Sequence, residues 1–279
     1  MAQNPIIVLK IGGSTAGNPT ALASIAQDMA SLSQRYSFVL AHGGSAQTNE
    51  LCKRLGIAPK FYTSPGGVKS RATDAQIISL YTMACGGQAN SQIVCAMQAA
   101  GVNAIGLTGL DGRAVTARQK IITSVDESGK QKVVRDDYTG KIEKINHELL
   151  LSLLSSGYTP VVAALALGEN SQPLNIDGDR LMAAIASALH ADMAISLTDV
   201  DGYYRNFPND LVPALTAFEL EAAMKNAGAG AASGGMKKKL MGCIEAIDGG
   251  VREVVIGNGT TASPITSLLA GAGTHITKN

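Results

Sequence analysis

Short apolar runs alternate along the chain with longer stretches in which apolar residues recur at helical spacing. This pattern predicts helices between successive strands. Strands rich in Val, Ile, Leu and Ala that helices cover on both faces form mainly parallel sheets, which bind ligands beyond the carboxyl ends of their strands. The sequence therefore predicts an α/β fold. The predicted strands cover 6–11, 37–41, 103–107, 159–165, 192–197 and 252–256, and the predicted helices cover 20–36, 73–100, 146–156, 178–189, 217–226 and 237–249.

The segment from about 108 to 145 interrupts this rhythm. Polar and apolar residues alternate over 119–125 and 132–135, and a Glu-Ser-Gly-Lys turn lies between them. This is the pattern of a β-hairpin. Within an α/β sheet we expect such an insertion to form a lid or a partner-facing appendage. The Ser-Pro-Gly-Gly turn at 64–67 predicts a second loop that could fold over a ligand.

Two of the predicted strands run directly into a pair of glycines, Gly12-Gly13 and Gly43-Gly44. A glycine pair at the carboxyl end of a strand lets backbone N–H groups approach an anion closely, because there is no Cβ in the way. Lys10 adds a positive charge to the first turn. Two such turns on neighbouring strands would bring two helix N-termini to one crevice. The alternative is that strand-to-helix turns simply favour glycine.

Polar residues in the second half of the chain add candidate chemistry. Asp177 and Asp179 lie at the start of the predicted helix 178–189, where carboxylates are favoured either as plain caps or as functional groups. Lys237, Lys238 and Lys239 follow Gly234-Gly235-Met236 at another helix start, where cations oppose the helix dipole. An anionic ligand would relieve that cost, although Lys237 and Lys238 also fit a solvated basic face.

Composition narrows the class of partner. The 279 residues allow one large domain or two lobes, and the net charge is only +1. A net charge this close to zero gives no case for a basic nucleic-acid-binding stripe. With no Trp and only four Phe there is no aromatic platform on which bases could stack, so we expect no nucleic-acid partner. The four cysteines have no CxxC spacing, which predicts reduced thiols and no zinc site. No charged leader or membrane-length apolar run is present, so we expect a cytoplasmic protein without membrane contact.

Five motifs follow one another over almost the whole chain, and in this order they resemble the amino acid kinase family, most closely its acetylglutamate kinase branch. They are Lys10-Ile-Gly-Gly, His42-Gly-Gly, Asn175-Ile-Asp-Gly-Asp179, Thr198-Asp-Val-Asp-Gly202 and Gly234-Gly-Met-Lys-Lys-Lys239. The resemblance implies a three-layer αβα sandwich with a mainly parallel central sheet. It implies an N-terminal lobe (1–172) that binds an acyl acceptor and dimerises, and a C-terminal lobe (173–279) that binds ATP.

The resemblance also implies a reaction and roles for individual residues. A phosphoryl group would pass from ATP to a side-chain carboxylate, giving an acyl phosphate. Lys10 and Lys239 match the two catalytic lysines, and Asp179 matches the aspartate that holds them. Mg²⁺ would bridge the ATP phosphates, with few dedicated protein ligands. The other matched positions are Gly12, Gly13, Gly43 and Gly44 at the phosphates and the attacking carboxylate, Asn175 at the α-carboxylate of the acceptor, and Thr198, Asp199, Gly235 and Met236 in the nucleotide site.

One loop departs from the acetylglutamate kinase pattern. Lys69 stands where that branch has an arginine for the substrate α-carboxylate, whereas Ser70-Arg71-Ala-Thr73-Asp74 resembles a neighbouring branch. Those kinases phosphorylate glutamate or 2-aminoadipate attached to a small acidic amino-group carrier protein, in lysine or arginine biosynthesis. The segment 135–142 is also similar to that branch. Lys69 and Arg71 are therefore candidate acceptor-binding residues.

Local charge favours an acidic, protein-sized acceptor. Between 51 and 73 there are five basic residues and no acidic one, and between 130 and 146 basic residues outnumber acidic ones five to three. Such patches steer acidic partners at short range, although exposed loops also carry solvated lysines. Free N-acetylglutamate is the alternative acceptor.

Other activities on the same fold are alternatives. A non-catalytic nucleotide or amino acid sensor would need the fold but not the combination of Lys10, Asp179 and Lys239. The sequence of the substrate loop argues against a carbamate or uridylate kinase activity but does not exclude it. From the family we expect a homodimer, and because the first strand starts by about Ile6 we expect no arginine feedback.

Overall fold

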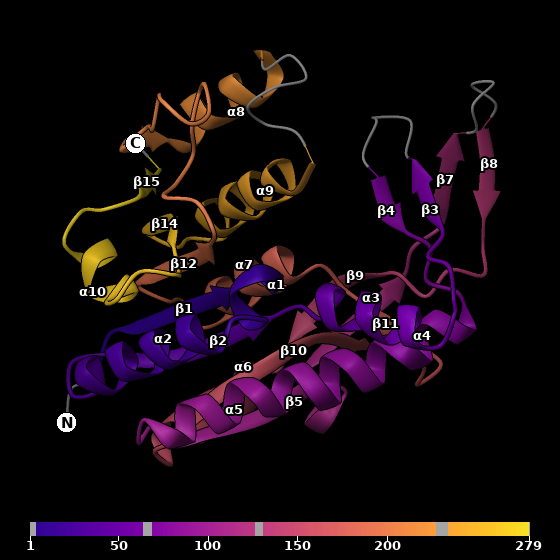
Figure 1. Cartoon of the computed structure of the whole chain (residues 1–279), viewed down its shortest axis with the longest axis horizontal. Coiled ribbons are helices and arrows are strands. Elements are labelled where there is room, and N and C mark those ends of the chain that lie inside the picture. Colours follow the sequence, from indigo (N-terminus) through magenta and orange to yellow (C-terminus); the bar gives the residue numbers. More distant parts are fainter. Residues whose placement is uncertain (1–3, 64–68, 126–130, 227–233, 279) are drawn as a thin grey trace.

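A single mixed sheet runs through the centre of the computed structural model, which describes residues 4–63, 69–125, 131–226 and 234–278 (Figure 1). Most neighbouring strands of this sheet pair in parallel, so their carboxyl ends meet at one edge. The predicted α/β fold with a mainly parallel sheet is confirmed. In the described residues the sheet order is β13 (Ala214–Thr216), β15 (Thr274–Thr277), β14 (Glu253–Asn258), β12 (Met193–Thr198), β1 (Ile6–Ile11), β2 (Ser37–His42), β10 (Thr159–Leu167), β6 (Val115–Gln119) and β9 (Gly140–Ile145), with β5 (Ala104–Gly109) and β11 (Pro173–Asn175) also pairing with β10.

Alternation along the strands separates two apolar cores. On β1, Ile7, Leu9 and Ile11 face one core, while Ile6 and Val8 face the other. The first core packs under α2 (Pro19–Leu32), α5 (Asn90–Ala99) and α10 (Pro264–Leu269). The second packs under α6 (His147–Ser155), α7 (Gly178–Ala188), α8 (Ala217–Asn226) and α9 (Gly234–Asp248). Because side chains alternate across a strand, Lys10 must lie on the α7 side of the sheet.

The long helix predicted over 73–100 is one helical rod with an irregular centre. It consists of α4 (Ala75–Tyr81), a π-helical segment η1 (Thr82–Ala89) and α5. The π segment includes Gly86 and Gly87, whose low helix propensity makes this the weak point of the rod. The short helices α1 (Gly13–Ala16) and α3 (Ser45–Arg54) begin at the two glycine pairs.

The segment 108–145 divides into two parts. Its flanking strands β6 and β9 pair with each other and extend the central sheet, so this part is not the appendage that the sequence predicted. The reason is packing, because Val115, Ala117 and Ile145 are buried in the α7-side core. Only the hairpin of β7 (Ile122–Val125) and β8 (Gln131–Val134) projects, beside a second hairpin of β3 (Phe61–Thr63) and β4 (Lys69–Arg71) (Figure 1).

The structure also bears on membranes and thiols. Among the helices in the described ranges, none combines the length and the apolar character needed to cross a bilayer. Cys52, Cys85, Cys95 and Cys243 are free thiols, as the sequence predicted, and Cys95 is exposed.

Candidate active site

A buried ion triad lies at the carboxyl edge of the sheet. The Asp179 carboxylate is 2.9 Å from Lys10 Nζ and 3.6 Å from Lys239 Nζ, with both distances to Oδ1. Asp177 caps α7 by accepting the N–H groups of Asp179 and Arg180, which fixes Asp179 in the first turn, where the helix dipole favours a carboxylate. The structure therefore brings together three side chains from β1, α7 and α9.

The three charges depend on one another. Burial disfavours the charge of Lys10, but Asp179 outweighs that cost and raises the pKa of Lys10 above its ordinary value. Burial likewise opposes ionisation of Asp179, yet the two ammonium groups lower its pKa. For Lys239, burial and the neighbouring Lys10 lower the pKa to about 8. One carboxylate thus holds two cations close together, and a second anion would relieve the excess positive charge.

Small residues let the helices approach this triad. A Cβ on Gly242 of α9 would meet the Asp179 carbonyl oxygen at 3.0 Å, and a Cβ on Gly178 would lie 3.6 Å from Lys10 Cε and 3.5 Å from Gly43 N. Gly178 therefore lies next to both the triad and the second glycine turn. Ser196 donates to Asp179 Oδ1 at 3.4 Å, and β1–β12 pairing places it opposite Lys10. Sequence reasoning gave no role to Ser196, Gly178 or Gly242, although Gly178 lies within a recognised motif and the other two lie close to one.

The two glycine turns lie side by side, as expected from neighbouring strands. A Cβ on Gly13 would be 3.8 Å from Ala46 Cβ, at the start of α3. One detail differs from the expectation: the Gly12 N–H is donated to Leu197 O of β12 at 3.2 Å and so completes the sheet. Gly13 opens α1, and the first N–H groups of a helix have no partner within it.

Gly44 is constrained by a neighbour. A Cβ at this position would lie 2.4 Å from Cys85 Cβ and 2.7 Å from Cys85 Cα, so only glycine fits against the π segment. Gly43 has open space at the corresponding position. In this turn Gly44 therefore packs tightly against η1, whereas the space next to Gly43 is open.

Candidate acceptor residues gather between the β3–β4 hairpin and β11. Arg71 donates to Asn49, its guanidinium lies 5.6 Å from the Phe61 ring centre, and its buried Nη1 has no partner within the described ranges. Asn175 Nδ2 donates to Thr73 Oγ1 at 3.2 Å. The Lys69 backbone pairs with Thr63, but its side chain lies outside the part of the chain that the structure describes.

The candidate nucleotide residues lie beyond β12 and at the start of α9. Thr198 is buried at the end of β12, and its hydroxyl donates to the exposed Asp199 at 3.1 Å. Gly235 is exposed at the start of α9, and the next residue, Met236, packs against the core beneath α7. Gly235 and Met236 thus precede Lys239 on the same helix. Over the described ranges, no three His, Cys, Asp or Glu side chains gather as a metal site.

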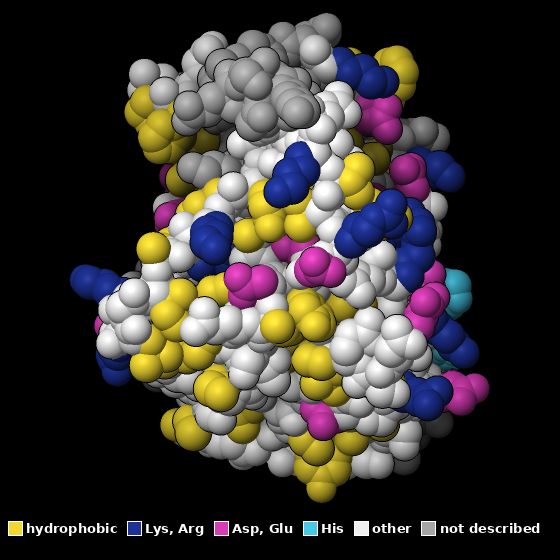
Figure 2. Space-filling view, turned by 90° about the vertical axis from the view of Figure 1, so that its right-hand side faces the viewer, with side chains coloured by type: hydrophobic (Ala, Val, Ile, Leu, Met, Phe, Trp, Pro, Cys, Tyr) yellow, Lys and Arg dark blue, Asp and Glu magenta, His cyan; other side chains and the backbone are white. Residues whose placement is uncertain are grey.

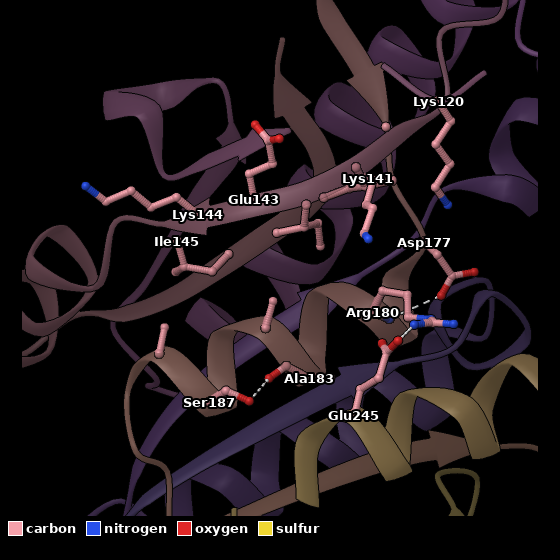
Figure 3. Close-up of a pocket in the computed structure, with 15 residues that line it drawn as sticks. Lys120, Lys141, Glu143, Lys144, Ile145, Asp177, Arg180, Ala183, Ser187 and Glu245 are labelled. Atoms are coloured by element: carbon pink, nitrogen blue, oxygen red, sulfur yellow. Dashed lines mark hydrogen bonds and ion pairs between the residues drawn. The ribbon is translucent and has the colours of Figure 1, made fainter. Parts of the chain in front are cut away.

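A groove of about 800 Å³ runs along the other side of α7, between this helix and β9 (Figure 3). Lys120, Lys141 and Arg180 lie at one end with Asp177, and Arg180 also pairs with Glu245 of α9. Burial lowers the pKa of Lys120, and the charge of Arg180 adds to this effect. The groove end next to the first turn of α7 is therefore positively charged.

The model of the amino acid kinase family matches residues 5–258. The chain belongs to the amino acid kinase family. Relatives that are named as LysW-aminoadipate or LysW-glutamate kinases match this chain over nearly its full length. The Thermus thermophilus LysW-aminoadipate kinase is 39% identical over 97% of this chain and 100% of its own, and the putative LysW-aminoadipate/LysW-glutamate kinase of Nitrosopumilus maritimus is 37% identical over 95% and 96%.

Solved structures of other proteins share the fold at lower identity. N-acetylglutamate synthase from Neisseria gonorrhoeae, complexed with coenzyme A and N-acetyl-glutamate, matches with a TM-score of 0.78 and 24% identity. The match covers 99% of this chain and 60% of the synthase chain. Giardia carbamate kinase matches over the full length of both chains, with a TM-score of 0.69 and 16% identity. These matches support the predicted αβα arrangement.

The triad predicts an alkaline limit to kinase activity. Lys239 carries its proton below about pH 8 and loses it above, so kcat/KM for ATP should fall as pH rises through that value. Lys239→Arg keeps the charge to higher pH, so it should be slower at neutral pH but should lose this limb. The measurement is a pH–rate profile of both proteins, with Lys237→Arg as the matched control. A limb that persists unchanged in Lys239→Arg would contradict the assignment.

Proposed function

We propose that this enzyme transfers the γ-phosphoryl group of ATP to the side-chain carboxylate of 2-aminoadipate or glutamate whose α-amino group is blocked by a small acidic carrier protein. The observation that carries the proposal is the buried triad beside the glycine turns, with two lysines on one aspartate. The names of full-length relatives support the acceptor. The pathway would be lysine or arginine biosynthesis.

The chemistry asks for positioning and charge neutralisation. A carboxylate oxygen attacks the γ-phosphorus, the bond to the leaving oxygen of ADP breaks, and an acyl phosphate forms with no proton to remove. In this proposal Lys10 and Lys239 neutralise the transferring group from two sides, and Asp179 keeps them in place. Both lysines lie at Oδ1 of Asp179, so in this proposal the carboxylate holds the lysines, and ATP enters with Mg²⁺ on its phosphates.

The acceptor would bind between the second glycine turn and the β3–β4 hairpin. The unpartnered Nη1 of Arg71 is suited to a carboxylate, since guanidinium groups bind carboxylates in bidentate pairs. Asn175 supplies an amide nearby, and Gly43 and Gly44 supply backbone N–H groups. Lys69 stays a candidate by its place in the sequence. Residues 1–172 would thus provide most of the acceptor site, joined by Asn175 from just beyond them, and 173–279 would bind the nucleotide.

Positive charge around this region fits an acidic carrier. Lys132 and Arg135 are exposed and line a hollow of about 290 Å³ with Tyr62, between the two projecting hairpins. On the end of the molecule from which the hairpins project, Lys and Arg side chains are interspersed with Asp and Glu side chains (Figure 2). Lys141 extends the positive surface into the groove along α7. We propose that the carrier docks across this face.

Two further expectations belong to the proposal. The family resemblance supports a homodimer formed through the N-terminal half of the sheet. The four free thiols support a cytoplasmic location. Both depend on the kinase function proposed here.

The choice of acceptor has a direct test. ADP release should be fast with the purified carrier conjugate and MgATP, and at least about tenfold slower in kcat/KM with free N-acetylglutamate, because the free compound makes no contact with the basic face. The control is the carrier protein without its amino acid. Faster turnover of N-acetylglutamate than of the conjugate would replace the proposed acceptor with the alternative. No turnover of either would favour a sensor.

Docking is tested by reversing charge. The triple change of Lys132, Arg135 and Lys141 to Glu should raise KM for the conjugate by about tenfold or more, since each removes attraction to an acidic partner. It should leave turnover of N-acetylglutamate within about threefold. Arg35→Glu is the control for charge reversal elsewhere on the surface. Arg35 is exposed just before β2, at the end of that strand opposite to the glycine turn. Equal losses with both acceptors would remove the docking argument.

A further inference from the structure

A buried histidine lies directly beneath the second glycine turn. His42 ends β2, and alternation along this strand turns its side chain to the same face as Phe38 and Leu40, toward α5. The ring is fully buried. Its Nδ1 lies 2.9 Å from Gly43 O, and its Nε2 lies 2.9 Å from Asn90 Nδ2 at the start of α5.

These contacts determine where the ring proton sits. Gly43 O can only accept, so Nδ1 must carry the proton, and Nε2 then accepts from the Asn90 amide. The orientation of that amide is fixed as well, because Asn90 Nδ2 also donates to Val161 O at 2.9 Å. A protonated Nε2 would face another donor. The network therefore holds His42 as the neutral Nδ1–H tautomer.

The space for Asn90 is specific. A Cβ on Gly106 of β5 would lie 2.0 Å from Asn90 Oδ1, so a glycine is needed for the amide to reach the ring. Asn90 also follows the π segment, whose Cys85 presses on Gly44. One helical rod thus contacts the turn twice, through Cys85 and through the Asn90–His42 pair.

We propose that His42, held in one tautomer by Asn90, is a positioning residue that orients the Gly43–Gly44 peptide toward the acceptor. In a planar trans peptide the C=O and the following N–H point in opposite directions. Binding of Gly43 O by the ring therefore turns the Gly44 N–H away from His42. On the other side, Gly44 O accepts from Thr48 N and Thr48 Oγ1, which ties the turn to α3. The proposal rests on the acceptor role of these glycines in the proposed function.

The tautomer can be measured without any substrate. In protein labelled with ¹⁵N-histidine, the ring of His42 should show a protonated Nδ1 and an unprotonated Nε2, unchanged from about pH 8 to about pH 5.5, because burial lowers its pKa to about 4. Loss of its signals in His42→Asn assigns them among the four histidines. A protonated Nε2, or titration near pH 6.5, would overturn the proposed network.

The positioning role is tested by two substitutions. His42→Asn keeps an N–H donor at the place of Nδ1, whereas His42→Leu removes it at comparable bulk. His42→Leu should lower kcat/KM for the acceptor by about 10- to 100-fold and leave KM for ATP within about twofold, because misplaced groups cost rate at this scale. His42→Asn should recover most of the loss. Equal losses in both variants, or a matching rise in KM for ATP, would overturn the positioning role.

The outcomes separate this inference from the proposed function. If wild-type protein turns over neither carrier conjugate nor N-acetylglutamate, the proposed function fails, and the ring tautomer still decides whether the network exists. If His42→Leu does not fold, Gly106→Ala provides the second variant, because its methyl group displaces the Asn90 amide from the ring. That variant should change the tautomer signal and lower acceptor kcat/KM. An unchanged signal and rate would contradict the inference.

Discussion

The attraction between one buried carboxylate and two ammonium groups determines the arrangement of this site. Asp179 lies between Lys10 and Lys239, and neither lysine would stay charged at this depth without it. The rest of the local structure serves this contact. The Asp177 cap starts α7 at the right residue, strand alternation turns Lys10 toward it, and Gly242 lets α9 approach closely enough for Lys239 to reach.

A centre of this kind is suited to an anion that arrives and leaves. With two cations on one carboxylate the site carries excess positive charge, and burial together with the charge of Lys10 lowers the pKa of Lys239 to about 8. A bound polyphosphate would stabilise both lysines in their charged forms. The excess positive charge of the two lysines would also contribute to the proposed catalysis. Negative charge on the transferring phosphoryl group would meet ammonium donors that are already in place.

The strand pattern predicted most of the fold because apolar periodicity is a local property. The strands 6–11 and 37–41 and the helices 178–189 and 217–226 were predicted nearly to the residue. The helix over 73–100 was only partly right, since periodicity does not distinguish an α-helix from the π-helical centre at Thr82–Ala89. The 108–145 segment was misjudged in part, because strand pairing between β6 and β9 is a long-range property. At the site, motif order predicted the meeting of Lys10, Asp179 and Lys239, but not Ser196, His42 or Asn90, whose roles depend on which strand faces which helix.

The central claim is that the triad transfers phosphoryl to a carboxylate of the carrier-bound amino acid, and trapping of the product tests it most directly. Hydroxylamine converts an acyl phosphate to a stable hydroxamate. With MgATP and the carrier conjugate, the account predicts one hydroxamate on the conjugated amino acid per ADP formed, and almost none with Asp179→Asn, in which the amide cannot hold both lysines. ADP formation without hydroxamate, or undiminished trapping by Asp179→Asn, would contradict it.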